Sequence, residues 1–420
     1  MPVAPVRRSA RLAAGGLALA LIVGGCSTGT APTTPTLPIP TRSAPEPHAP
    51  SPAVSCTPDA AAAASKLATL ARSGPASGTW VGMNIDWGTE TVADVAARLG
   101  RPPAVVVSFV AFPLAAADVA NLDAAAAQAR DAGAVLVATL EPWSGLAAVT
   151  DASLDALVER LKAYGRDNVP TIVRFAHEMN GSWYPWGEDA TAYVAAFRRV
   201  ADAIHDGAPT AGVLWAPNQG DGYPYIGGKY AVKKGSAASK VLDTNNDGRV
   251  DGADDPYAPY WPGDAYVDWV GMSLYHWGTT YPWGANVVPA AGKFAGLLTG
   301  ATTSGGHVPD FYADYAERHQ KPLAIIETAA LYRPAGKGAT ASAIKLAWLG
   351  QVISPATLAR FPRLRLVNWF EWKKNEAEVH DIVDWRISAD PKLRAAFLAA
   401  VSDGFTLGPV VVPEPTCPAG

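Results

Sequence analysis

Eight short runs of mostly apolar, β-forming residues alternate along this chain with stretches of helical pattern. The runs are Trp80–Ile85, Ala104–Val110, Ala134–Leu140, Thr171–Ala176, Gly212–Ala216, Asp268–Leu274, Leu323–Glu327 and Leu364–Phe370. The helical stretches are Val92–Leu99, Ala115–Ala132, Leu154–Tyr164, Thr191–His205, Pro309–His319 and Ala341–Ile353. Strands that alternate with helices pair in parallel, so the pattern predicts an α/β fold, a single closed (β/α)8 TIM barrel. An open doubly wound sheet is the alternative, but no Gly-rich phosphate loop follows the first run.

Residues 1–25 have the pattern of an export signal. Several arginines precede the apolar stretch Leu17–Val23, which is too short to span a bilayer as a permanent helix. The stretch leads into Val23-Gly-Gly-Cys26, which resembles a bacterial lipobox and implies cleavage before Cys26 and lipid on its thiol. We therefore expect an exported lipoprotein that faces outward from the cell membrane. An ordinary secretory signal is the alternative.

Residues 26–58 are rich in Pro, Ser, Thr and Ala, a composition that predicts a disordered tether. The remainder, residues 59–420, suits one large barrel or two ordinary domains, and we expect one catalytic domain with a long insertion at about residues 220–264. Cys56 and Cys417 flank this region. Outside the cytoplasm such a pair predicts a disulfide between the two ends of the domain, with two free thiols as the alternative.

The composition and charge of the chain indicate which kinds of molecule it is expected to bind. The formal net charge is -4 and no basic patch stands out, so nucleic acid is not an expected partner. The chain contains 14 Trp, many of them near turn residues, which suits a carbohydrate-binding cleft. We expect a monomer that binds a polysaccharide and reaches the membrane through its lipid anchor.

Two glutamates follow or end apolar runs that lie far apart in the chain. Glu178 follows the fourth run, and Glu327 ends the seventh. Active sites of such barrels lie at the C-terminal ends of the strands, so both side chains are expected in one cleft. A pair of carboxyl groups is what glycosidic bond cleavage requires, because one protonates the departing oxygen and the other attacks the anomeric carbon or activates water. The alternative is a structural Glu178 in a buried ion pair with Arg174. The two residues are an even number of positions apart, so they could lie on the same face of a strand.

The segment His177-Glu-Met-Asn-Gly181, followed by Trp183 and Trp186, resembles the acid/base motif of glycoside hydrolase family 26. Further segments are similar to the family's strands five and six: Val213–Asn218, Trp261–Asp264 and Val267–Tyr275. The likeness extends from about Trp80 to Trp372. The family consists of retaining barrels with glutamates on strands four and seven, mostly β-mannanases, with some mixed-linkage β-glucanases and β-1,3-xylanases.

The resemblance implies a role for each matching residue. Glu178 would be the general acid/base and Glu327 the nucleophile, with Tyr275 hydrogen-bonded to the nucleophile. His177 would orient the acid/base and the sugar, and Trp183 would stack on a sugar ring. Further predicted substrate contacts are Trp186, Arg174, Asn218, Trp143 and Trp372. Many mannanases of the family carry an aromatic cluster where this chain has Trp183-Tyr-Pro-Trp186. The proline changes the wall beside the cleavage point, which favours a glucan substrate.

A second motif lies in the insertion after the fifth run. Oxygen-bearing side chains occupy positions 1, 3, 5, 9 and 12 of a twelve-residue loop with Gly at position 6, as in the calcium loop of EF-hands. The predicted ligands are Asp243, Asn245, Asp247, Asp251 and Asp254, with the carbonyl of Arg249. We expect a structural Ca²⁺ that braces the insertion, with a solvated acidic loop as the alternative. No organic cofactor is expected.

Together with the two glutamates, the family resemblance implies a retaining endo-β-glycanase that acts by double displacement on a β-linked polysaccharide, with β-1,4-mannan as the first candidate. Mixed-linkage β-1,3-1,4-glucan is the second candidate substrate. A non-catalytic polysaccharide-binding lipoprotein is the alternative from another class, but it would not need both glutamates. A metal-dependent hydrolase is disfavoured because the predicted strands contain no His-x-His pair.

Overall fold

Eight parallel strands close into a barrel, which confirms the predicted fold class. The strands are β1 (Thr79–Ile85), β2 (Val105–Ala111), β3 (Val135–Glu141), β4 (Thr171–Phe175), β5 (Ala211–Trp215), β6 (Trp269–Ser273), β7 (Leu323–Thr328) and β8 (Leu364–Glu371). Each strand pairs with the next, and β8 pairs with β1 from Trp80↔Leu366 to Ile85↔Glu371. This last pairing closes the sheet and excludes the open doubly wound alternative. Every predicted strand lies within one residue of its observed ends.

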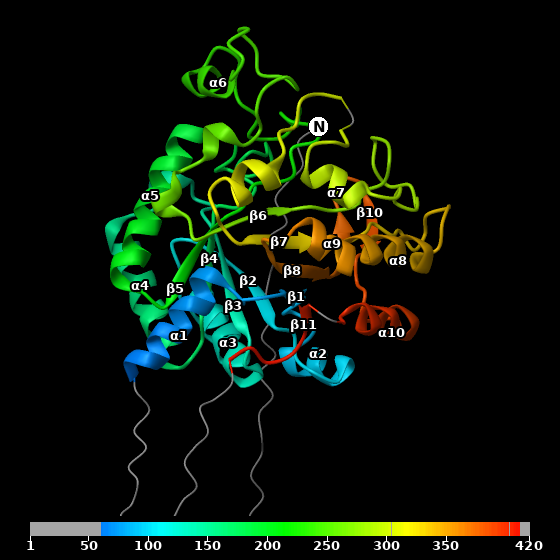
Figure 1. Cartoon of the computed structure of the whole chain (residues 1–420). Helices are drawn as coiled ribbons and strands as arrows, with labels where there is room; N and C mark the ends of the chain where they lie inside the picture. Colours follow the sequence, from blue (N-terminus) through cyan, green and yellow to red (C-terminus); the bar gives the residue numbers. More distant parts are fainter. Residues whose placement is uncertain (1–59, 304, 403, 412–420) are drawn as a thin grey trace, which may run out of the picture. The chain divides into compact units, whose positions relative to one another are not determined.

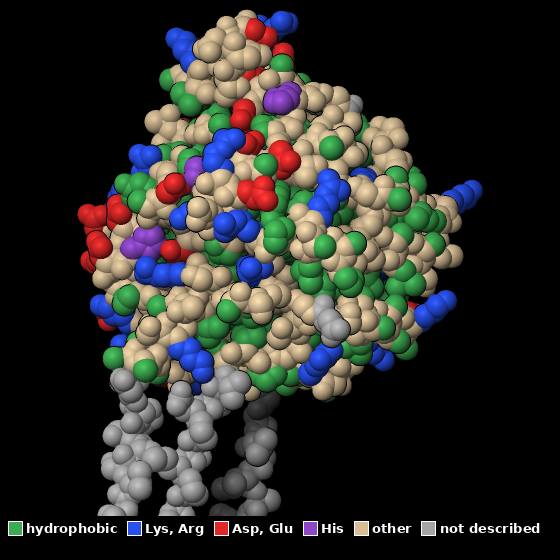
Figure 2. All heavy atoms as spheres, in the orientation of Figure 1, with side chains coloured by type: hydrophobic (Ala, Val, Ile, Leu, Met, Phe, Trp, Pro, Cys, Tyr) green, Lys and Arg blue, Asp and Glu red, His purple; other side chains and the backbone are tan. Residues whose placement is uncertain are grey.

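The computed structural model describes residues 60–303, 305–402 and 404–411. The predictions for Cys26, for the tether and for a disulfide between Cys56 and Cys417 lie outside these residues. Within the described part of the chain, no helix is long and apolar enough to cross a membrane. On the face shown in Figure 2, Lys and Arg side chains are scattered among acidic and apolar ones and form no large basic patch.

Helices surround the barrel (Figure 1). They are α1 (Ala60–Ser73), α2 (Val92–Leu99), α3 (Ala116–Ala132), α4 (Asp151–Arg166), α5 (Ala190–Gly207), α6 (Ala237–Leu242), α7 (Lys293–Leu298), α8 (Ala341–Val352), α9 (Pro355–Arg360) and α10 (Pro391–Ala400). The local sequence explains their ends. At α2, Thr91 and Asp94 each accept a hydrogen bond from the other's backbone N–H, and Gly100 ends the helix with a φ of 75°, which glycine adopts without steric cost.

Some local predictions differ from the structure. The stretch Pro309–His319, predicted as a helix, contains the π-helical turn η4 (Tyr312–Glu317). The insertion, for which no helix was predicted, contains α6 and two short 3₁₀ turns, η2 (Ala258–Tyr260) and η3 (Asp264–Tyr266). The elements without a sequence prediction are α1, α7, α9, α10, the 3₁₀ turn η1 (Leu146–Ala148), the antiparallel pair β9 (Lys373–Glu376) and β10 (Asp381–Asp384), and the short β11 (Phe405–Thr406), which pairs with β1.

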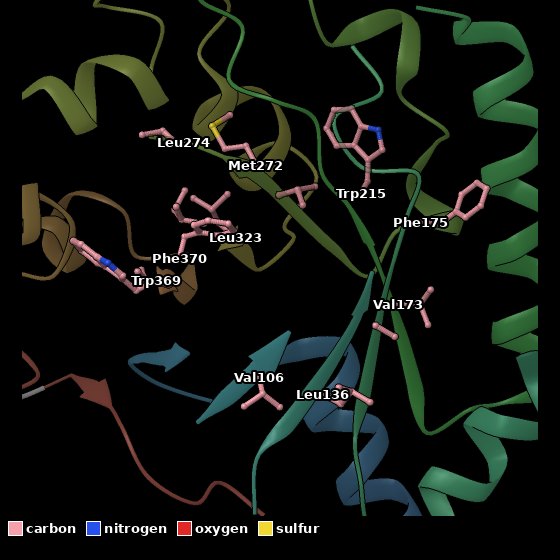
Figure 3. Packing of buried hydrophobic residues seen from close by; sticks show 14 of the residues in the cluster. Val106, Leu136, Val173, Phe175, Trp215, Met272, Leu274, Leu323, Trp369 and Phe370 are labelled. Carbon is pink, nitrogen blue, oxygen red and sulfur yellow. The ribbon is translucent and has the colours of Figure 1, made fainter. Parts of the chain in front are cut away.

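Side chains of the barrel strands alternate between two apolar clusters, as the period of two in a β-strand requires. One cluster packs between the strands and the helices; in Figure 3, Val173 and Phe175 of β4 point toward this helical layer. The other fills the barrel interior and includes Val105, Val135, Val137, Ile172, Leu214, Ala324 and Leu366. Farther along the strands, the interior positions become polar: Asn84, Thr139, Arg174, Ser273 and Asn368. The barrel interior therefore changes from apolar to polar toward the C-terminal ends of the strands.

The N-terminal ends of the strands are covered by the two ends of the described chain. Trp269, the first residue of β6, donates its Nε1 hydrogen to the carbonyl of Ala71 in α1 (2.7 Å). Arg72 of the same helix donates to the carbonyl of Ala211, the first residue of β5 (3.0 Å). The backbone N–H of Val410 donates to the carbonyl of Gly133, which precedes β3 (2.8 Å). The polar interior residues lie at the opposite end of the barrel, where the strands have their C-terminal ends.

Candidate active site

Glu178 lies just beyond the C-terminal end of β4, in a strained turn. The strand ends at Phe175, one residue earlier than predicted, and Ala176 and Glu178 have φ values of 47° and 54°. Non-glycine residues rarely adopt this left-handed conformation, and it is concentrated at functional sites. The N–H of Glu178 donates to the carbonyl of Ala216 (2.9 Å), which fixes the turn against the end of β5. The parity argument that linked Arg174 with Glu178 therefore does not extend past Phe175.

Glu327 lies in β7 at an irregular point of the sheet. The pairing of β6 with β7 shifts between Met272 and Ser273, so that Ser273 pairs with Glu327. The pairing of β7 with β8 also shifts, between Ile325 and Thr328. Such irregularities change the direction of a side chain and are common next to active sites. The carboxylate of Glu327 is almost completely buried, with 7% of the residue exposed.

Arg174 connects the two glutamates from the barrel interior. Its Nη1 donates to Oε1 of Glu327, and its Nη2 donates to the hydroxyl of Ser273 (2.8 Å). The same hydroxyl lies close enough to the carboxylate of Glu178 to lower the pKa of that group. The chain of contacts Glu327–Arg174–Ser273–Glu178 places both carboxylates in one site. Arg174 itself is completely buried and contacts Glu327, so in this structure no part of it is open to a substrate.

The surroundings of Glu178 favour its protonated form. Burial is the main cause that raises the pKa of Glu178, to about 7, and the negative charge of Glu327 raises it further. The charge of Arg174, the nearby hydroxyl of Ser273 and the hydrogen bond from Trp183 act in the opposite direction. Trp183 donates its Nε1 hydrogen to Oε2 of Glu178 (2.9 Å). A carboxylic acid with this pKa can give up a proton near neutral pH, as a general acid must.

Tyr275 and His177 also lie at the site. The hydroxyl of Tyr275 donates to Oε2 of Glu327 (2.7 Å), the contact that the family resemblance implied. Burial, followed by the charge of Glu327, holds the pKa of Tyr275 well above its usual value, so this hydroxyl keeps its proton. Burial and the charge of Arg174 hold the pKa of His177 well below its usual value, so its ring is neutral.

Trp186 lies behind His177 and has no surface open to a sugar. It is completely buried, its Nε1 donates to the carbonyl of His177 (2.7 Å), and its ring stacks on Tyr184 with centroids 4.4 Å apart. The predicted contact of Trp186 with substrate is therefore not available in this structure. The tryptophan supports the wall of the site by packing against the His177 ring at 5.8 Å.

The other predicted substrate contacts lie around the same end of the barrel. Trp143 is 50% exposed, and Trp183 is half-buried beside Glu178. Trp372 is half-buried, stacks on Phe370, and has a buried Nε1 with no hydrogen-bond partner among the described residues. Asn218 uses its backbone N–H and carbonyl to bind the side chain of Asn180 (2.8 Å each). Its own amide donates to the hydroxyl of Tyr225 (3.3 Å), so Asn218 connects Tyr225 of the insertion with Asn180 of the turn after β4.

Three further residues at the site were not among the predicted site residues. Ser273 bridges Arg174 and Glu178, and no local sequence pattern distinguishes it from other serines. Tyr184 lies among carboxylates: burial first, and then the charges of Glu178, Glu141 and Glu327, hold the pKa of Tyr184 well above its usual value. Glu141 ends β3 and so carries the same signal, an acidic residue at the end of an apolar run, that identified Glu327.

The predicted calcium loop forms a series of tight turns in the insertion. Asp243 accepts hydrogen bonds from two backbone N–H groups of the loop. Asp254 is buried, and its carboxylate accepts from the N–H groups of Thr244 (2.6 Å) and Asp251 (2.9 Å). The ligand types suit calcium, but among the described residues no group of three or more His, Cys, Asp or Glu side chains is arranged to hold a metal ion. The other predicted ligands lie on half-buried or exposed parts of the loop: Asn245, Asp247, Arg249 and Asp251.

Part of the sequence is similar to known proteins. Residues 135–230, which include Glu178, match the model of the family described as Glycosyl hydrolase family 26. A curated relative, Endoglucanase H of Acetivibrio thermocellus, is 25% identical over 284 residues, which cover 65% of this chain. The matched region is 25% of that relative's own length.

Solved structures show the same barrel. Two structures of an endo-β-1,4-mannanase from Cellulomonas fimi, one of them a double mutant, match with a TM-score of 0.51 each. The double mutant is 18% identical, over 84% of this chain and 76% of its own. The other is 19% identical, over 85% of this chain and 77% of its own. At these identities the likeness establishes the fold.

Proposed function

We propose that this chain is a glycoside hydrolase of family 26 and that it cuts internal β-1,4 bonds of a polysaccharide with retention of the anomeric configuration. The observation that carries the proposal is the chain of contacts from Glu327 through Arg174 and Ser273 to Glu178. It holds two carboxyl groups with different environments at one end of the barrel. Retention requires the two groups to lie about 5–5.5 Å apart, close enough to act on one anomeric centre.

In the first step, Glu178 acts as the acid. Its raised pKa keeps a proton on the carboxyl group near neutral pH, and this proton passes to the glycosidic oxygen as the bond to the anomeric carbon breaks. Glu327 attacks the same carbon and forms a glycosyl ester. The Tyr275 hydroxyl fixes the direction of the attacking carboxylate through its hydrogen bond to Oε2.

In the second step, Glu178 acts as the base. Once Glu327 is esterified, its negative charge no longer raises the pKa of Glu178. The pKa of Glu178 falls, and the carboxylate can accept a proton from water. That water attacks the anomeric carbon, the ester bond breaks, and Glu327 leaves as a carboxylate. The charge interaction between the two glutamates thus switches Glu178 between its two roles.

Two polysaccharides are candidate substrates. β-1,4-Mannan is the first, because most members of the family that the motifs resemble act on it. A glucan with β-1,4 bonds is the second, and two specific observations favour it. The curated relative with 25% identity is named an endoglucanase, and Pro185 interrupts the aromatic cluster beside the acid/base.

The test is the release of reducing ends from glucomannan, galactomannan, lichenan, barley glucan and β-1,3-xylan, with the first product's anomeric form followed by NMR. We expect activity on a mannan or a glucan, a retained configuration, and a loss of at least about 10³-fold in kcat for Glu327→Gln. Glu317→Gln, the same exchange at an exposed position, is the matched control. Full turnover by Glu327→Gln, or an inverted first product, would overturn the proposal. Binding without turnover by the wild-type protein would favour the non-catalytic alternative.

A further inference from the structure

Tyr225, in the insertion after β5, packs against the indole that donates to Glu178. Its ring meets the ring of Trp183 edge to face, with centroids 4.9 Å apart and an interplanar angle of 66°. Trp183 donates its Nε1 hydrogen to Oε2 of Glu178 (2.9 Å). The insertion therefore reaches the acid of the proposed reaction through a single intermediate side chain.

The hydroxyl of Tyr225 is bound to the catalytic end of the barrel. It donates to the carbonyl of Gln219 and accepts from the side-chain amide of Asn218 (3.3 Å). The N–H of Gln219 in turn donates to the carbonyl of Ser273 at the end of β6 (3.1 Å). Since a tyrosine hydroxyl has only one hydrogen to donate, the bond to Gln219 leaves none for a substrate. The hydroxyl thus fixes the ring of Tyr225 and offers no donor to a sugar.

The backbone of Tyr225 is held against the turn after β4. Its carbonyl accepts from the hydroxyl of Ser182 (2.6 Å), the residue that precedes Trp183. The N–H of Tyr230 donates to the carbonyl of Ser182 (2.8 Å), and a Cβ added at Gly228 would lie 2.0 Å from the Ser182 hydroxyl oxygen. Tyr225 itself has a φ of 53°, a conformation that non-glycine residues keep only where surrounding contacts hold it. These contacts place the insertion directly on the turn that carries the indole.

Two close neighbours set the orientation of the Trp183 indole. One is Gly181, where an added Cβ would lie 2.3 Å from the ring, so the indole packs directly on the glycine backbone. The other is Tyr225; the ring of Tyr184 lies farther away, with centroids 6.3 Å apart. An indole has one N–H, and a hydrogen bond weakens as its angle departs from linear, so a rotation of the ring would weaken the bond to Glu178. Tyr225 restricts this rotation, because an edge-to-face pair has a preferred geometry.

Replacing Tyr225 leaves the charges around Glu178 unchanged. Burial is the main cause that holds the pKa of Tyr225 well above its usual value, so its hydroxyl is neutral. The other titratable groups near Glu178 are Glu141 of β3, Arg174 of β4, the neutral His177, Tyr184, Tyr275 and Glu327 of β7. An effect of Tyr225 on Glu178 must therefore act through Trp183 or through the access of water.

We propose that Tyr225 is a positioning residue for the acid/base: its ring holds the Trp183 indole in the orientation that donates a hydrogen bond to Glu178. The proposal rests on the proposed function for the role of Glu178. The insertion then takes part in catalysis without supplying a group that reacts.

The test compares the ionisation of Glu178 in wild type, Tyr225→Leu and Tyr225→Phe. Leucine keeps apolar cover over the indole but removes the aromatic edge and the hydroxyl, whereas phenylalanine removes the hydroxyl alone. We expect the alkaline limb of kcat/KM to move to higher pH by about 0.3–1 unit in Tyr225→Leu, because a weaker bond from Trp183 stabilises the ionised Glu178 less. Tyr225→Phe should move the limb less. Tyr230→Leu, the same exchange in the same insertion, should leave it in place.

A double variant separates positioning from a general loosening of the insertion. Trp183→Phe has no indole N–H to position, so adding Tyr225→Leu to it should move the alkaline limb no further. If the shifts of the two single variants add, or if the limb of Tyr225→Leu stays in place, the proposal is wrong. A limb that moves to lower pH overturns it as well, since this result is expected if Tyr225 only excludes water from Glu178.

The positioning can be tested without turnover by ¹³C NMR of carboxyl-labelled glutamate, with the Glu178 signal identified by its loss in Glu178→Gln. If wild type cleaves no glycan, but the Glu178 signal titrates at higher pH in Tyr225→Leu and this difference vanishes in the Trp183→Phe background, the hydrolysis is wrong and the positioning stands. If the enzyme is active but the signal titrates at the same pH in wild type and Tyr225→Leu, the positioning is wrong. If wild type is inactive and the signal does not respond to Tyr225→Leu, both proposals fail.

Discussion

Arg174 forms its ion pair with Glu327 and not with Glu178. Both groups of the pair are withdrawn from solvent, since Arg174 is completely buried and 7% of Glu327 is exposed. The pairing balances the charge of one carboxylate and leaves the other without a cationic partner of its own. Glu178 therefore keeps a raised pKa, although Arg174 lies near enough to lower it in part. The asymmetry gives two chemically identical side chains different roles.

Replacing Arg174 tests this pairing. Arg174→Met should abolish most activity and destabilise the protein by about 3–5 kcal/mol, because it leaves the buried carboxylate of Glu327 without a partner. The melting temperature and kcat/KM measure the two effects. The double variant Arg174→Met with Glu327→Gln removes the unpaired charge as well, so we expect it to be more stable than the single variant. If the double variant is no more stable, Glu327 does not depend on Arg174.

The pH dependence of activity follows from the pKa of Glu178. The acid must carry its proton, so kcat/KM should fall as the pH rises through about 7. Trp183→Phe removes the N–H that donates to the ionised carboxylate. Without this donor the ionised form is less stable, the pKa of Glu178 rises, and the alkaline limb of the profile should move to higher pH by up to about one unit.

The control for the pH experiment is Trp283→Phe, the same exchange in the loop after β6, which should leave the alkaline limb in place. If the alkaline limb of Trp183→Phe moves to lower pH, or stays in place while only KM changes, the hydrogen bond from Trp183 does not have the proposed effect.

The ionisation of Glu178 should also make the free energy of unfolding depend on pH. Its pKa is about 7 in the folded state against a reference of 4.5. The folded state therefore disfavours the ionised form, and the stabilising contribution that is present below pH 4.5 is lost as the pH rises to about 7. Glu178→Gln cannot ionise. Its stability relative to wild type should rise over this interval by about 1–3 kcal/mol and stay constant above it.

Thermal or urea unfolding of Glu178→Gln at intervals from pH 4 to 9 measures this difference. Glu317→Gln, at an exposed position in η4, should show no such rise. A Glu178→Gln variant that follows the wild-type curve at every pH would show that Glu178 ionises as easily in the folded state as in the unfolded chain.

The calcium loop remains a proposal with a direct test. Binding would require Asp254 to exchange its backbone N–H donors for the ion. If the loop binds calcium, saturation at 100 times Kd should stabilise the protein by about 2.7 kcal/mol, and a chelator should lower the melting temperature. Asp247→Ala should remove the response. No shift with calcium or chelator, together with no metal by elemental analysis, would establish the solvated acidic loop.

The sequence pattern predicted the barrel because the features that define it are local. Apolar runs, helical periods and their order suffice to place eight strands to within a residue. Glu178 and Glu327 were found in the same way, since a glutamate after a buried run is a local signal and parallel strands bring such ends together. Glu141 carries the same signal but lies outside the motif that the family resemblance supplies, and so it was overlooked.

The partners of these residues were harder to predict because they depend on contacts distant in sequence. The pairing of Arg174 with Glu327 follows from the register shift next to Ser273, which no pattern within β6 or β7 reveals. The burial of Trp186 follows from its packing under His177 and Tyr184. β4 ends at Phe175, before the strained turn at Ala176 and Glu178. The alternation of side chains along the strand, which had linked Arg174 with Glu178, therefore does not reach Glu178.

The two ends of the described chain cover the N-terminal ends of the strands, away from Glu178 and Glu327. A support joined to the protein at Ala60 or at Val411 would therefore meet the side of the barrel opposite Glu178 and Glu327. Such a linkage would leave the end of the barrel that holds the two carboxyl groups uncovered. No rearrangement of the fold would be needed for a protein immobilised in this way to meet a long polymer.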